Sequence, residues 1–116
     1  MNSALDQTLQ IARPLLARIE QEYRPKQVWL FGSRGRGTEG PSSDWDFLVV
    51  VSDEADEEAL DPLRAWRIQK DSGVVADVVI CTESDFRADR ETVNTIGYVV
   101  AREGVRVFER SATDRK

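Results

Sequence analysis

The sequence predicts a mixed α/β fold (α+β in its order of elements), with a small mixed sheet of about four strands packed against helices. Short runs rich in Val, Ile and Phe alternate with longer segments whose apolar residues recur every three or four positions. Gly, Pro and Asp residues separate these segments. The expected strands are residues 27–31, 43–51, 74–80 and 105–109, and the expected helices are residues 3–22, 61–71 and 82–103.

Length and composition limit the organisation and the chemistry. The chain has 116 residues, of which 41% are hydrophobic, so we expect one domain over residues 1–110 and a disordered tail over 111–116. The net charge of −5 argues against general nucleic-acid binding. No histidine is present, which excludes histidine-based zinc sites, general bases and Ser-His triads. Catalysis would therefore depend on carboxylates, metals, arginines or lysines.

The cellular compartment is indicated by what the sequence lacks. The single cysteine cannot form an intrachain disulfide, which fits a reducing environment. No apolar run approaches the roughly 20 residues that a membrane span needs, and the first residues do not have the pattern of a signal peptide. We therefore expect a cytoplasmic protein that does not bind membranes.

The first helix is expected to be amphipathic. Its apolar residues recur at spacings of three and four. Pro14 should kink this helix or mark a restart, and Arg24-Pro25 should end it. The apolar residues are Leu5, Leu9, Ala12, Leu16, Ile19 and Tyr23.

The stretch from residue 30 to residue 51 organises the rest of the chain. Its second half enters an expected strand in which alternate side chains share a face. Asp44 and Asp46 would then project together, on the same face as Leu48 and Val50. Two carboxylates at the start of one strand repel each other without a cation, and paired carboxylates with open positions suit Mg²⁺.

The first half of the same stretch is suited to phosphate. Gly32 allows a close approach of backbone that a side chain would block, and Ser33 is a good N-cap for a short helix. A helix N-terminus favours phosphate, and Arg34 and Arg36 could add positive charge. A phosphate site beside a metal site indicates nucleoside triphosphate chemistry.

The second half of the chain supplies one more candidate carboxylate. Residues 74–80 are expected to form a buried strand, with Asp77 on the same face as Val75 and Val79. A buried carboxylate is costly unless it is paired or binds a metal. Asp77 could therefore join the other two aspartates, or it could be a structural residue bonded to an arginine or to backbone.

The remaining segments are expected to cover the sheet. The acidic stretch 53–58 should be a solvated loop or the first turn of a helix, and 105–109 should be an edge strand. Gly97 is a weak point within the last helix, and Gly104 suits the position after it. The residues expected to be buried by the later helices are Leu63, Trp66, the stem of Lys70, Phe86, Val93, Ile96 and Val100.

The Gly-Ser pair, the ten-residue spacing and the Asp-x-Asp pair resemble the signature of the DNA polymerase β-like nucleotidyltransferase superfamily. The stretch LFGSRGRG…SSDWDFLVV resembles its minimal stand-alone branch, often antitoxins paired with HEPN-domain toxins, from roughly residue 28 to residue 108. The resemblance implies a nucleotidyltransferase fold in which Gly32 and Ser33 hold the triphosphate. It implies two metal ions on Asp44 and Asp46, with Asp77 as the third carboxylate. Trp45 departs from the usual aliphatic residue, but it should face away from the metals.

The resemblance also implies a function. The chain would use ATP and two Mg²⁺ ions to transfer a nucleotide, with Arg36 among the groups that hold the phosphates. The acceptor would most plausibly be a hydroxyl of a HEPN-type toxin, so the chain would be an adenylylating antitoxin. Two alternatives remain open: an antitoxin that masks its toxin by binding alone, and transfer to a small molecule or an RNA end. Self-association is a further option.

Overall fold

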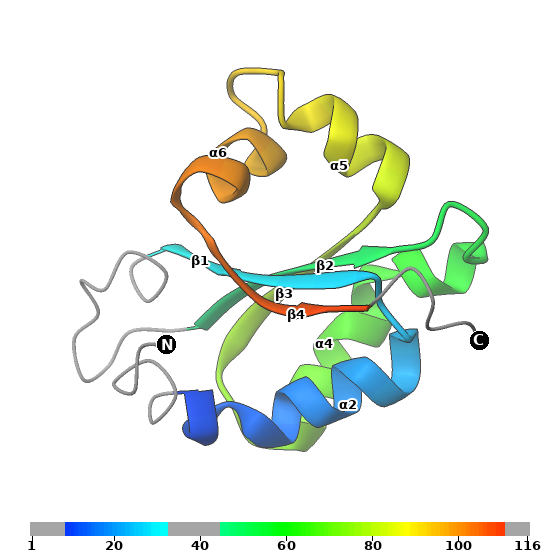
Figure 1. Ribbon diagram of the computed structural model, residues 1–116. Coiled ribbons are helices and arrows are strands. Elements are labelled where there is room, and N and C mark those ends of the chain that lie inside the picture. Colours follow the sequence, from blue (N-terminus) through cyan, green and yellow to red (C-terminus); the bar gives the residue numbers. More distant parts are fainter. Residues whose placement is uncertain (1–8, 33–44, 111–116) are drawn as a thin grey trace.

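A computed structural model of the protein describes residues 9–32 and 45–110 (Figure 1). Within these residues a four-stranded sheet of order β3-β2-β1-β4 lies between two layers of helices, which confirms the predicted mixed fold. Helices α2 and α4 cover one face, and α5 and α6 lie over the other (Figure 1). The strands are β1 (Gln27–Phe31), β2 (Trp45–Val51), β3 (Ala76–Thr82) and β4 (Val105–Glu109). The helices are α2 (Arg13–Tyr23), the 3-10 helix η1 (Glu57–Leu60), α4 (Pro62–Ser72), α5 (Glu83–Asp89) and α6 (Ile96–Glu103).

The sheet is mixed. Strand β1 pairs antiparallel with both β2 and β4, whereas β2 pairs parallel with β3. The first and last strands have the predicted bounds, and the second is confirmed from residue 45 onward. Strand β3 begins two residues later than predicted, because the backbone of Val74 belongs to the turn after α4. The Val74 N–H donates a hydrogen bond to Ser72 Oγ at 3.1 Å, and the Val74 carbonyl oxygen accepts one from Gln69 Nε2 at 2.6 Å.

The larger core lies between the sheet and the layer of α2 and α4. The restart expected at Pro14 is confirmed, because α2 begins at Arg13 with the proline in its first turn, where no intrahelical N–H is needed. The predicted apolar stripe packs inward from Leu9 onward, with Leu15 as an additional member, and Leu5 lies outside the described residues. Side chains from β2 fill the centre of this core. Its buried members on α2 and β2 are Leu15, Ile19, Tyr23, Trp45, Phe47, Val49 and Val51.

Helix α4 is capped at both ends, but it turns a different face to the core than the sequence predicts. The Asp61 carboxylate accepts a hydrogen bond from Leu63 N–H at 3.0 Å, and Gly73 follows the helix at φ +78°. The prediction that Leu63 and Trp66 are buried is wrong, since their exposed fractions are 61% and 53%, and Lys70 is exposed as well. The small Ala65 and Ile68 form the buried stripe instead. Only one of the two apolar stripes on this short helix can face the sheet.

The single helix predicted over 82–103 is wrong, because the chain forms α5 and α6 with a turn at residues 90–95. Threonine side chains compete with the helical backbone there: Thr92 Oγ1 donates to Ala88 O at 2.9 Å, and Thr95 Oγ1 caps Tyr98 N–H at 3.1 Å. Thr82 caps α5, since its side chain accepts a hydrogen bond from Asp85 N–H. Phe86 and Val100 are buried as predicted.

The turn also changes which residues α5 and α6 bury. Val93 and Ile96 are exposed, in contrast to the prediction, because the turn carries Val93 away from the sheet and α6 begins only at Ile96. Gly97 allows α6 to pack closely on the end of α5, since a Cβ there would lie 2.5 Å from Asp89 Cβ. Gly97, expected to weaken a single helix, therefore lies at a close contact between α5 and α6.

Strand β4 forms one edge of the sheet, as predicted. Gly104 follows α6 at φ −82°, so it is not a left-handed cap. Its role is steric, because an added Cβ would meet Val100 O at 2.7 Å and Leu30 O at 3.1 Å. Among residues 9–32 and 45–110, no helix is long and apolar enough to cross a membrane.

Candidate active site

Two predicted site aspartates lie side by side at the start of the parallel strand pair. Asp46 is directly opposite Asp77 in the β2–β3 register. The same register pairs Leu48 with Val79, and both belong to the core under α5 and α6. Since side chains alternate along a strand, both carboxylates lie on that face of the sheet. The structure therefore brings together the aspartates that the sequence suggested would meet.

Gly32 completes this corner of the sheet. It directly follows Phe31, which pairs with Asp46 across the β1–β2 ladder. Its φ is +74°, and a Cβ added there would overlap the Asp46 carboxylate. Glycine is thus required at position 32 for two reasons, the backbone angle and the close approach of the carboxylate.

Asp77 is exposed, so the expectation of a buried strand with a buried carboxylate is wrong. The reason is topological, because β3 is the last strand of the described sheet and has neighbours on only one side. The Asp77 side chain makes no hydrogen bond or ion pair within the described residues, so the alternative of a structural aspartate finds no partner in this part of the chain.

The other predicted site residues, Ser33, Arg34, Arg36 and Asp44, lie outside the described residues. Trp45 faces the opposite side of the sheet from Asp46, as expected. It is buried and stacks on Phe47, with ring centroids 5.9 Å apart and planes 6° from parallel. The tryptophan therefore belongs to the larger core and not to the candidate site.

The donor set fits a hard divalent cation. Asp46 and Asp77 offer carboxylate oxygens from adjacent strands, and such oxygens are the ligands that Mg²⁺ prefers. No group of three metal-binding side chains occurs within residues 9–32 and 45–110. A three-carboxylate site would therefore need Asp44, immediately before the described part of β2.

A second carboxylate contact, which the sequence patterns did not predict, joins the far ends of β2 and β3. Asp53 accepts hydrogen bonds from both the backbone N–H of Ser84, at 2.9 Å, and its hydroxyl. These bonds hold the pKa of Asp53 below its ordinary value. The two residues are 31 positions apart, so no local pattern could connect them. The contact fixes the start of α5 relative to β2.

Cys81 is the one cysteine of the chain, and it lies beneath α5 in the core that contains Leu48 and Val79. Burial, together with the nearby charges of Asp85 and Asp89, raises the pKa of its thiol to about 12. A protonated thiol is a poor nucleophile. Cys81 is therefore a packing residue and not a candidate nucleophile.

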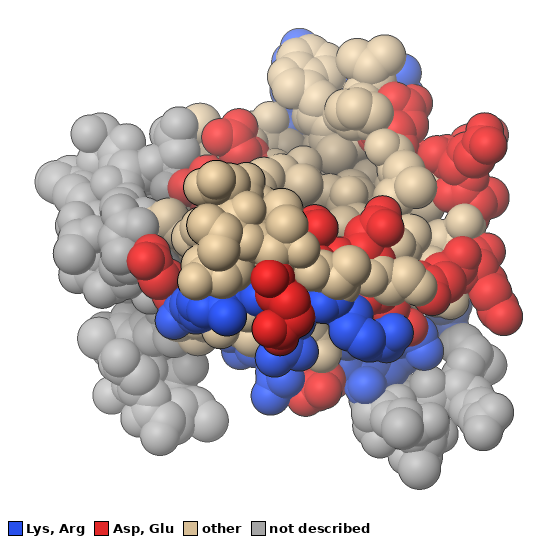
Figure 2. Space-filling model, turned by 90° about the horizontal axis from the view of Figure 1, so that it is seen from above, with Lys and Arg blue, Asp and Glu red and all other residues tan. Residues whose placement is uncertain are grey.

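Uncharged side chains make up much of the surface over α5 and α6, with several acidic side chains among them (Figure 2). Basic side chains gather along one border of this view. The described residues on this face therefore carry charges of both signs.

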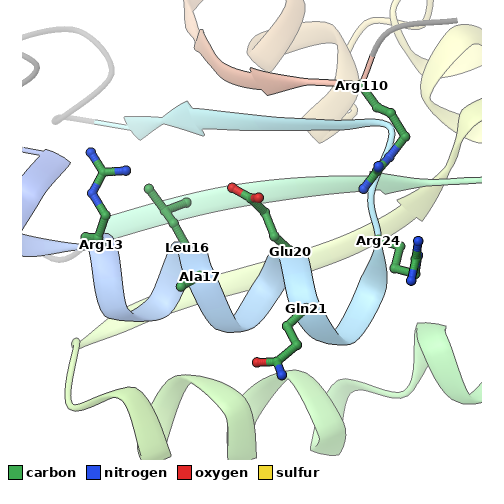
Figure 3. Close-up of a pocket in the computed structure, with 7 residues that line it drawn as sticks. All are labelled: Arg13, Leu16, Ala17, Glu20, Gln21, Arg24 and Arg110. Carbon is green, nitrogen blue, oxygen red and sulfur yellow. The ribbon is translucent and has the colours of Figure 1, made fainter. Parts of the chain in front are cut away.

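A pocket of about 470 Å³ lies away from the paired aspartates, between α2 and the end of β4. Arg13, Glu20 and Arg110 extend into the space between these elements (Figure 3). Its lining mixes both signs of charge and includes none of the predicted site residues. The pocket is thus separate from the candidate active site.

Comparisons with known proteins agree with this geometry. Among solved structures, a protein of Sulfolobus solfataricus provisionally assigned as a nucleotidyltransferase has a TM-score of 0.62 and 21% identity, over 93% of this chain and 86% of that one. A toxin–antitoxin structure with AMP-PNP has a TM-score of 0.55 and 20% identity, over 86% and 75%. Another toxin–antitoxin structure, an MntA–HpeT variant with two aspartate-to-glutamate substitutions, has a TM-score of 0.54 and 19% identity, over 85% and 74%.

At these identities the structural likeness establishes the fold. No curated protein matches the sequence. The family model described as a nucleotidyltransferase domain matches residues 13–101, which include Gly32, Asp46 and Asp77. The chain therefore belongs to the nucleotidyltransferase domain family.

Proposed function

We propose that this protein is a Mg²⁺-dependent nucleotidyltransferase that moves AMP from ATP to a hydroxyl of a partner toxin, and that it acts in the cytoplasm as the antitoxin. The observation that carries the proposal is the pairing of Asp46 with Asp77 beside Gly32. Family membership supports the reaction class.

Each candidate residue has a role in this proposal. Asp44, Asp46 and Asp77 would hold a pair of Mg²⁺ ions. The bound metal would supply charge neutralisation on the triphosphate and on the attacking and leaving oxygens. Gly32 lets the chain turn tightly past Asp46. Ser33 and the arginines Arg34 and Arg36 would bind the β- and γ-phosphates.

The reaction is a displacement at the α-phosphorus. The acceptor hydroxyl oxygen forms a bond to that phosphorus, the bond to the bridging oxygen of pyrophosphate breaks, and pyrophosphate leaves with the electron pair. The proton of the hydroxyl goes to a nearby carboxylate. Asp77 suits this step because it is exposed and its side chain makes no hydrogen bond within the described part of the chain.

Two of the similar structures support a toxin as the acceptor. Both are described as toxin–antitoxin assemblies, and one of them contains AMP-PNP. The variant of the other replaces two aspartates that stand two positions apart, the same spacing as Asp44 and Asp46. A HEPN-type toxin as the partner rests on the sequence resemblance. The alternative is an antitoxin that masks its toxin by binding alone.

Intact-mass spectrometry tests the proposal. The product of the neighbouring gene is incubated with this protein, ATP and Mg²⁺, beside the variants Asp46→Asn and Asp71→Asn. Asp71 is an exposed aspartate on α4, away from the site, so it is the matched control. We expect a gain of one or more AMP units with the wild type and the control, and none with Asp46→Asn.

The opposite result distinguishes the alternatives. A stable complex of the two proteins without any mass gain would favour masking by binding. A mass gain that persists undiminished in Asp46→Asn would contradict the assignment of the active site.

A further inference from the structure

We propose that the β3 edge of the sheet and the adjoining face of α4 bind a second copy of this chain across a two-fold axis. This surface does not depend on the proposed function, although Asp77 of the candidate site lies near the start of β3. It consists of the outer backbone edge of β3 together with Leu63, Trp66 and Lys70 on α4.

The two edges of the described sheet differ in protection. Strand β3 is seven residues long and contains no lysine, arginine or proline. Strand β4 is five residues long, carries Arg106 and Glu109, and pairs with β1 through a register shift. Charges, shortness and bulges are the features that keep an edge strand from pairing with another chain. Strand β4 has them, and β3 has Asp77 alone near its start.

Exposed apolar side chains flank the unprotected edge. Trp66 lines a groove of about 110 Å³ together with Ala76, Asp77 and Val78 of β3. Leu63 is exposed one turn before it on α4. Large apolar groups gathered beside an open strand edge are typical of a protein interface.

Symmetry favours a second copy as the occupant. A two-fold axis perpendicular to the sheet would pair β3 antiparallel with its counterpart and keep both copies of α4 on the same side. The two α4 helices would then run antiparallel next to each other. The apolar side chains of one copy would contact the same side chains of the other, so the same surface would be buried on both copies.

The charges on this surface are also self-complementary. Glu57 and Glu58 lie exposed before the N-terminal end of α4, and Lys70 lies near its C-terminal end, 4.8 Å over the Trp66 ring. Asp71, at the same end, is directed to Arg18 on α2, 4.0 Å away. In the antiparallel arrangement Lys70 of one copy would approach the acidic end of the other.

The register avoids repulsion between the exposed aspartates. Val79 is the middle residue of β3. Pairing centred there would put Asp77 opposite Cys81 of the second copy and not opposite its own equivalent. Both active sites would open on the same face of a continuous eight-stranded sheet.

Sedimentation velocity of the full chain tests the proposal with a pair of charge variants. We expect the wild type to form a dimer with increasing concentration. Lys70→Glu alone, and Glu57→Lys combined with Glu58→Lys, should each shift the protein to monomer, since each homodimer would bring like charges together. An equimolar mixture of the two variants should restore the dimer, because both pairs regain opposite charges.

Hydrogen exchange identifies the strand that pairs. Amides of β3 should gain protection with concentration, whereas those of β4, the matched edge, should not. A wild type that stays monomeric at every concentration, or a dimer that both charge variants and their mixture leave unchanged, would overturn the proposal. A monomeric protein whose complex with the toxin is lost in Trp66→Glu would also overturn the proposal, because Trp66 would then bind the toxin and not a second copy.

Discussion

The two faces of β2 differ in what they contribute. Residues Trp45, Phe47, Val49 and Val51 are buried in the larger core with α2 and α4. On the opposite face Leu48 and Val50 join a smaller cluster under α5 and α6. That face begins with Asp46, opposite Asp77. Strand β2 thus packs in the larger core through one face and carries the candidate chemistry at the start of the other. Substitutions on the two faces should therefore affect stability and activity separately.

The largest effect is expected at the carboxylate face. Asp46→Asn should lower nucleotidyl transfer by about 10³-fold or more, equivalent to about 4 kcal/mol in the barrier, because a neutral amide binds Mg²⁺ poorly. Stability should change much less than activity, since Asp46 lies at the start of β2 and outside both core clusters. Steady-state rates and urea unfolding measure the two properties. If the loss of activity only matched a loss of folded protein, the separation of chemistry from stability on the two faces of β2 would be contradicted.

The next effect is expected in the larger core. Phe47→Ala should lower the free energy of unfolding by about 3–5 kcal/mol, because it opens a cavity at a fully buried position. Leu63→Ala, at an exposed apolar site, should change it by about 0.5 kcal/mol or less. Denaturant titrations of both variants provide the comparison. Equal destabilisation would show that the exposed stripe of α4 is part of the core.

Gly32 should affect chemistry more than stability. Gly32→Ala places a methyl group against the Asp46 carboxylate and forces alanine to φ +74°. Gly73→Ala is the matched control, since its φ is +78° and nothing lies within 4 Å of the added Cβ. Both should lose about 1–2 kcal/mol of stability, but only Gly32→Ala should also lose transfer activity. Equal transfer activities of the two variants would mean that the position of the Asp46 carboxylate is not critical for the reaction.

The smallest effect concerns the contact between Asp53 and Ser84. The folded-state pKa of Asp53 lies below its ordinary value of 3.8, so the contact stabilises the fold above that pH. The stabilisation should disappear as the pH falls through the lowered pKa. Unfolding measured against pH should show a shallower acid dependence in Asp53→Asn than in the wild type. Identical slopes would show that the contact does not stabilise the fold.

The strands were predictable because their apolar runs are short and bounded by turn residues. Alternation predicts which side chains share a face within each strand, and the observed pairing of β2 with β3 puts Asp46 and Asp77 on one face of the sheet. It could not show that Asp77 is exposed, because an apolar run does not reveal which strand is an edge. The orientation of α4 also failed, since periodicity cannot rank Trp66 against the smaller Ala65, which permits closer packing on the sheet.

The division of α5 from α6 was not predictable from apolar spacing either. It depends on Thr92 and Thr95, whose hydroxyls bond to nearby backbone carbonyls. Such local bonds interrupt a helix without changing its apolar pattern. The phosphate-binding roles of Ser33, Arg34 and Arg36 and the metal-binding role of Asp44 remain predictions.

The most direct test of nucleotidyl transfer at this site uses ATP labelled at either the α- or the γ-phosphate. The protein, Mg²⁺ and the candidate acceptor are incubated with each nucleotide, with Asp46→Asn in parallel. Label from the α-phosphate should appear on the acceptor, and label from the γ-phosphate should appear in released pyrophosphate, both only with the wild type. Transfer of the γ-label to the acceptor, or α-label transfer that survives in Asp46→Asn, would contradict the account.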